Sequence, residues 1–267
     1  MKRTLFNLLR FTLPVAIIVW LVWRAWADPQ FQANFLKLIA RPQNNWHLLL
    51  GAWLLSLSAV MVTMVRWCLL VVALGLPFYF KDALRLGFLG YLFNFVTPGS
   101  VGGDIFKAVG IAREHPARRP AAVASVVLDR IIGLYGLFLV ASVAILIEGP
   151  ANLAAPPTIR IIVQTTLACT AIGAVGIFML LIPGVTSGRV TARLARLPKV
   201  GLTAVKLVEA IRTYSRKPWV LATNVGLSMI VHVLSTTSIY LIAIGTPGVV
   251  PTYLDHFLIV PLAMVVG

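Results

Sequence analysis

Long apolar runs are the feature that most constrains the fold of this 267-residue chain. A helix of about 20 residues crosses the hydrocarbon core of a bilayer, which is about 30 Å thick. Runs that reach or approach this length lie at 5–26, 46–76, 120–147, 159–182, 218–245 and from 253 onward. Because a chain inside lipid must satisfy its backbone hydrogen bonds within the segment, these runs predict transmembrane helices.

Composition and the ends of the chain agree with this prediction. Charged residues make up 12% of the chain, which is about half their share in soluble domains, and the mean hydropathy is +0.92. We therefore predict an all-α, polytopic membrane helix bundle, with 1–267 as a single transmembrane domain. The first run has no small-residue cleavage site before Asp28, which indicates an uncleaved helix. The last run is still apolar at Gly267, so we expect the C-terminus to be incomplete.

Basic residues, which give the chain a net charge of +15, gather in short segments between the apolar runs. Such segments mark the cytoplasmic ends of membrane helices, so the three basic residues within 1–10 predict a cytoplasmic N-terminus. Segment 184–217 has eight basic residues and one acid, Glu209, and we expect it to be cytoplasmic as well. Its part 199–217 has apolar residues at helical spacing. This part is either a surface helix packed on the bundle or an interfacial helix that meets anionic lipid.

A Gly-rich turn, TPGSVGGD at 97–104, interrupts the apolar sequence between the second and third runs. The apolar arm before it, 83–97, would be about 22 Å long as a helix, too short to cross the core. Basic residues flank both arms at their far ends. Because both ends then lie on the cytoplasmic side, we predict a re-entrant hairpin over 82–112 with the turn as its tip.

The predicted tip has the composition of a site for an anionic group. Irregular backbone inside a membrane must be covered by protein or line a wet cavity. Pro98 ends the first arm, and Gly99, Gly102 and Gly103 permit positive φ and close approach to a ligand. Asp104 is a candidate N-cap of the second arm, whose amides and helix dipole suit a phosphate. The other interpretation is a simple loop between two short helices.

Asp129 and Arg130 lie about nine residues inside the third run. A charge at that depth costs at least about 2.5–3.5 kcal/mol, so each should have a partner. Asp104 and Lys107 of the hairpin are at similar depth and are candidates for crossed pairs. These residues form either an ion-pair network that joins hairpin and span, or such a network together with a headgroup site.

The remaining polar residues of the apolar runs have simpler interpretations. Arg66 lies near the cytoplasmic end of its run, where snorkelling would account for it. His232 is expected to be packed and neutral. Cys68 and Cys169 are not spaced as metal ligands are, so we interpret them as packing residues. With no nucleotide-binding or nucleic-acid-binding motif in the sequence, we expect no metal, no cofactor and no nucleic acid.

At 90–139 the chain resembles the flippase-like family related to the transmembrane region of lysylphosphatidylglycerol synthetase. The residues that carry the resemblance are Pro98-Gly99, Gly103-Asp104, Lys107 and Asp129-Arg130. The chain departs from the family in having Asp where Glu is frequent and Gly133 where an acid is often found. A second Gly-rich motif would fall beyond Gly267. The resemblance implies a protein that moves a polar-headed lipid between the two leaflets.

Together, these features predict a flippase-like protein of the inner cell membrane that moves an anionic or glycosylated lipid. The predicted headgroup site comprises Pro98, Gly99, Gly102, Gly103, Asp104, Lys107, Asp129 and Arg130. In this interpretation Lys107 and Arg130 contact phosphate, the carboxylates hold these cations, and no catalytic residue is needed. One alternative is a lipid-modifying enzyme with Asp104 or Asp129 as general base. The other is a membrane scaffold for a lipid-synthesising enzyme partner.

Overall fold

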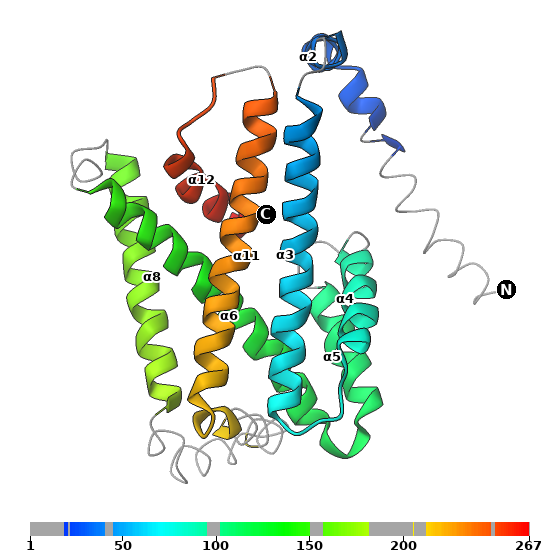
Figure 1. Ribbon diagram of the computed structural model, residues 1–267, viewed down its shortest axis with the longest axis vertical. Coiled ribbons are helices and arrows are strands. Elements are labelled where there is room, and N and C mark those ends of the chain that lie inside the picture. Colours follow the sequence, from blue (N-terminus) through cyan, green and yellow to red (C-terminus); the bar gives the residue numbers. More distant parts are fainter. Residues whose placement is uncertain are drawn as a thin grey trace, which may run out of the picture.

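The computed structural model describes residues 19–20, 22–40, 45–94, 102–149, 157–181, 205, 212–246 and 249–266. These residues are mostly helical and include no strand, which confirms the all-α prediction (Figure 1). The elements are α2 (Pro29–Ala40), α3 (Trp46–Ala73), α4 (Phe80–Asn94), α5 (Gly102–Glu114), the 3-10 turn η1 (Pro116–Arg118), α6 (Arg119–Glu148), α8 (Pro157–Leu181), α11 (Pro218–Gly245) and α12 (Tyr253–Val266).

Four helices of the described part, α3, α6, α8 and α11, are long and apolar enough to cross a membrane. They correspond to four of the predicted spans. The prediction for 5–26 falls largely outside the described residues. Helix α12, with 14 residues, belongs to the run predicted from 253 onward. Of the predicted basic segment 184–217, only residues 205 and 212–217 are described.

The centre of the bundle is formed by α3, α11 and α6. Helices α3 and α11 run side by side, and α6 crosses them (Figure 1). Ser238 of α11 donates a hydrogen bond to the Ala52 carbonyl of α3 at 2.7 Å and contacts Ser56 at 2.8 Å. Where α6 meets α11, a Cβ on Gly136 would lie only 2.2 Å from the Ser228 hydroxyl oxygen. Small and hydroxyl side chains thus bring these helices close together, as in other membrane bundles.

The outward faces of the long helices are apolar. Trp53 on α3, Ile172 on α8 and Ile230 on α11 are examples of large side chains that are exposed on the bundle surface. Exposed apolar surface of this extent is unfavourable in water. A surrounding bilayer would cover it, which agrees with a multi-pass membrane protein.

Side chains from two other segments cap the C-terminal end of α3 by donating hydrogen bonds to its carbonyls. The Lys217 ammonium donates to the Ala73 carbonyl at 2.8 Å, and Arg118 donates to the next two carbonyls at 2.8 and 3.2 Å. These carbonyls have no partner within the helix, and cations favour this end of the helix dipole. The Tyr214 hydroxyl donates to the Leu70 carbonyl at 2.8 Å. Burial raises the pKa of the Tyr214 phenol, which therefore stays protonated and able to donate.

Helices α4 and α5 form an antiparallel hairpin beside α3 and α6. Near its open end, Arg85 of α4 forms an ion pair with Glu114 of α5. At its tip, the Gly103 amide of α5 donates to the Asn94 side-chain oxygen of α4 at 2.6 Å. Both ends of the hairpin lie at the C-terminal end of α3, and the tip reaches only partway along that helix (Figure 1).

Candidate functional site

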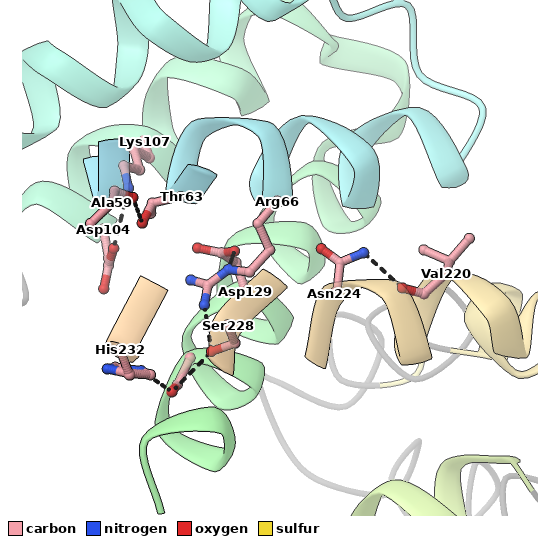
Figure 2. A network of polar contacts seen from close by, with 11 residues as sticks. Ala59, Thr63, Arg66, Asp104, Lys107, Asp129, Val220, Asn224, Ser228 and His232 are labelled. Atoms are coloured by element: carbon pink, nitrogen blue, oxygen red, sulfur yellow. Dashed lines mark hydrogen bonds and ion pairs between the residues drawn. The ribbon is translucent and has the colours of Figure 1, made fainter. Parts of the chain in front are cut away.

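Five charged side chains gather where the hairpin meets α3 and α6, and all of them except Arg130 are labelled in Figure 2. They are Arg66 of α3, Asp104 and Lys107 of α5, and Asp129 and Arg130 of α6. They separate into two groups with different geometry. We call Arg66 and Asp129 the buried pair, and Asp104, Lys107 and Arg130 the open cluster.

The buried pair joins three helices. The Arg66 Nε atom donates to Asp129 Oδ1 at 2.8 Å, and its Nη1 donates to the Ser228 hydroxyl of α11 at 2.9 Å. The side chains of the pair are only 7% and 9% exposed. The two hydrogen bonds that the guanidinium donates offset part of the cost of removing the charges from water. The prediction that Arg66 snorkels to the surface is wrong, because Arg66 lies on the inward face of α3.

Gly133 of α6 provides space for the buried pair. A Cβ at this position would lie 3.2 Å from Arg66 Nη2. The Gly133 carbonyl contacts His232 Nε2 at 2.9 Å and accepts a longer bond from Ser228 at 3.4 Å. Because a carbonyl only accepts, the His232 Nε2 atom carries a proton in this contact. His232 is thus packed within the bundle, as the sequence suggested.

The open cluster is more loosely held. Asp104 Oδ1 lies 4.0 Å from Lys107 Nζ, and Asp104 Oδ2 lies 3.6 Å from Arg130 Nε. The side chains are 10% exposed for Lys107, 26% for Asp104 and 51% for Arg130. The structure therefore contains the predicted crossed pair of Asp104 with Arg130. The other crossed pair is wrong, since Asp129 binds Arg66 and not Lys107.

Aromatic rings hold the Lys107 ammonium beside the hairpin. Its Nζ atom lies 5.5 Å from the centre of the Trp67 ring and 5.7 Å from that of Tyr91. These distances are within the range of cation–π attraction. The side chain is largely buried, so its position is fixed before any ligand arrives.

The hairpin tip differs from the prediction in two ways. Asp104 is not an N-cap, because α5 already begins at Gly102, and the first-turn amide of Gly103 is satisfied by Asn94. Gly102 and Gly103 lie within α5 and do not have a positive φ, and a Cβ on Gly103 would lie 2.5 Å from the Gly90 carbonyl oxygen of α4. The predicted residues Pro98 and Gly99 lie outside the described residues.

Sequence reasoning missed the neutral residues around the charges. Trp67, Tyr91 and Ser228 lie in apolar runs and have no local pattern that distinguishes them from packing residues. Asn94 was detectable in principle as an amide side chain at the end of the apolar arm, within reach of a following helix. Arg66 was detectable as well, because a cation inside an apolar run requires a partner.

The two groups together carry one surplus positive charge. Three cations, Arg66, Lys107 and Arg130, face two carboxylates, Asp104 and Asp129. The chain has eight acidic residues in all, and the other described ones lie outside these two groups, as Glu114 does at the open end of the hairpin. The arrangement therefore suits an anion. In the described ranges, no group of three or more His, Cys, Asp or Glu residues could hold a metal ion.

Comparison with known proteins gives one match that covers nearly the whole chain. The family model described as the lysylphosphatidylglycerol synthase TM region matches residues 11–267. No curated protein and no solved structure matches the chain at a significant level. The chain therefore belongs to the family of the lysylphosphatidylglycerol synthase TM region.

Proposed function

We propose that this protein moves a lipid with an anionic, polar headgroup across the cell membrane, and that Lys107 and Arg130 contact the headgroup. The observation that carries the proposal is the open cluster, in which two cations share one carboxylate at the level of the hairpin tip. Membership in a family of lipid-related membrane regions supports a lipid as the ligand.

The hairpin is re-entrant in this proposal. Helices α4 and α5 have 15 and 13 residues, which correspond to about 22 and 20 Å, less than a bilayer core of about 30 Å. Their exposed side chains include apolar ones such as Leu92 and Ile105, which suit contact with lipid chains. The hairpin then brings the open cluster below the membrane surface, where a headgroup has few polar partners.

The end of the bundle where α3 terminates faces the cytoplasm in this proposal. Exposed basic residues of three segments are close to this end: Lys81, Arg85, Arg113, Arg118, Arg119 and Arg216. Basic residues mark the cytoplasmic side of membrane proteins. The basic residues within 1–10 then favour a cytoplasmic N-terminus, and we propose the inner membrane as the location.

The mechanism needs no covalent chemistry, so we propose a carrier and not an enzyme. A phosphate crossing hydrocarbon alone loses its hydration, and the energetic cost is large. Lys107 and Arg130 would replace water as donors to the phosphate, and charge-assisted hydrogen bonds of this kind are stronger than neutral ones. The buried pair keeps α3, α6 and α11 together beside the cluster while the headgroup passes.

Transfer of a fluorescent anionic phospholipid in proteoliposomes tests the proposal. We expect Lys107→Gln and Arg130→Gln each to lower the transfer rate about tenfold, because each removes one charge-assisted contact worth about 1.5 kcal/mol. Arg113→Gln is the matched control, since it removes an equal charge from an exposed position of α5 and should transfer at the wild-type rate. Unchanged transfer in both cluster variants would refute the proposal.

Mass spectrometry of the recovered lipid is expected to show an unaltered mass, and an altered mass would support the lipid-modifying enzyme instead.

A further inference from the structure

We propose that Asp104 is a displaceable counter-ion, whose carboxylate competes with the lipid phosphate for Lys107 and Arg130. This inference rests on the proposed function and deepens it. It assigns to Asp104 the control of both the affinity for the headgroup and the rate of its release. It also narrows the ligand to phosphate-bearing headgroups, because an uncharged sugar could not replace a carboxylate between two cations.

The two groups of charges differ in how tightly their members are held. Arg66 and Asp129 lie 2.8 Å apart and are almost fully buried, and Ser228 gives the guanidinium a further partner. Asp104 lies 3.6 and 4.0 Å from its two cations, beyond normal hydrogen-bond length, and is partly exposed. Exposed ion pairs are weak, whereas breaking a buried pair is costly. Only the open cluster can therefore exchange a carboxylate for another anion at low cost.

The backbone keeps Asp104 from approaching its cations more closely. Its neighbour Gly103 is held against α4 by the bond to Asn94 at 2.6 Å and by contact with the Gly90 carbonyl. On the other side, Lys107 is held over Trp67. The short Asp side chain therefore stops short of both cations, and a carboxylate at these distances is displaced more easily than one in a hydrogen-bonded pair.

Asp104 also balances part of the positive charge of the cluster when no lipid is bound. Without Asp104, two cations would stand together in a largely apolar setting, which is unfavourable. With Asp104 present, the cluster is partly neutralised before the lipid arrives and after it leaves. An anion that binds and departs repeatedly needs such a substitute, because very tight binding slows release.

Binding of a short-chain phosphatidylglycerol to the purified full chain, measured by calorimetry, tests this role with two variants of opposite sign. Asp104→Asn removes the competitor and is expected to bind about five- to tenfold more tightly, which corresponds to about 1 kcal/mol or slightly more. Its transfer rate in proteoliposomes should fall, because release is slower. Asp104→Glu keeps the charge but is one methylene longer, so it should reach the cations and weaken binding. Equal or weaker binding by Asp104→Asn, or equal or tighter binding by Asp104→Glu, overturns the proposal.

The matched control is Glu148→Gln. It makes the same charge change at the C-terminal end of α6, far along that helix from Arg130, and should leave the affinity for phosphatidylglycerol unchanged. A similar gain in affinity there would show a general charge effect and overturn the role of Asp104. Thermal melting of each variant establishes that it is folded.

The cation variants Lys107→Gln and Arg130→Gln distinguish a failure of the proposed function from a failure of the role of Asp104 alone. If they bind as the wild type does, the proposed function fails, and if they lose binding but Asp104→Asn gains none, only the role of Asp104 fails.

Discussion

Two adjacent residues, Asp129 and Arg130, take opposite roles because a helix turns about 100° per residue. Asp129 points into the bundle and binds Arg66, whereas the Arg130 side chain is half exposed and faces Asp104. The sequence placed both in one headgroup site. The geometry pairs Asp129 with Arg66 inside the bundle and places Arg130 in the open cluster, beside the proposed ligand.

Because Arg66 and Asp129 form a buried ion pair, we expect the stability losses of substitutions at the two positions not to add. Asp129→Leu should lower stability by about 3–5 kcal/mol, because it leaves the Arg66 cation buried without its carboxylate. Arg66→Met should do likewise from the other side. The double variant should be more stable than either single one, because no uncompensated charge remains. Melting of the purified protein in detergent measures this, and simple addition of the two losses would contradict the assignment.

At the scale of elements, glycine and serine decide how closely the helices approach. Gly136 lets α6 contact α11 at Ser228, and Gly103 lets α5 contact α4 at Gly90. These contacts hold the buried pair and the hairpin in place without a large side chain. Membrane helices gain little from burying apolar surface against one another, so close packing of this kind carries much of their association.

The contact at Gly136 predicts a position-specific loss of stability. Gly136→Ala would put a Cβ 2.2 Å from the Ser228 hydroxyl oxygen, so we expect a loss of about 1–3 kcal/mol from overpacking. Gly226→Ala on α11 is the matched control, because in the described part of the chain nothing beyond the adjacent backbone of its own helix lies within 4 Å of the added Cβ. Since Ala favours helices more than Gly, that control should be neutral or slightly stabilising. Equal melting of the two variants would contradict the close contact between α6 and α11.

At the scale of the whole molecule, the sequence predicted the spans better than the site. The run at 46–76 became α3 at Trp46–Ala73, because the length of an apolar run is visible in the sequence. The inward face of α3 was not visible, since a helix that is apolar on all sides has no polar face to orient it. Arg66 was misread because its place near the end of the run suggested snorkelling, although a cation inside an apolar run requires a partner. The hydrogen bond that the Gly103 amide donates to the Asn94 side chain depends on how the chain folds back on itself, so the sequence could suggest Asn94 as a capping residue but could not specify its partner.

The proposed re-entrant placement of the hairpin predicts which positions react with a membrane-impermeant thiol reagent from each side of the membrane. Single cysteines at Lys81 and Arg113, in a Cys68→Ala and Cys169→Ala background, should react only from the cytoplasmic side. Asn45→Cys, at the opposite end of α3, should react only from the outside. Ile105→Cys is the decisive variant. The Ile105 side chain is exposed on the surface of the bundle, close to the hairpin tip, so lipid should protect a cysteine there from reagent added on either side of the membrane. Rapid reaction of that cysteine from the outside would mean that the tip emerges into water. The open cluster would then lack the apolar surroundings that make its two cations useful to a lipid phosphate.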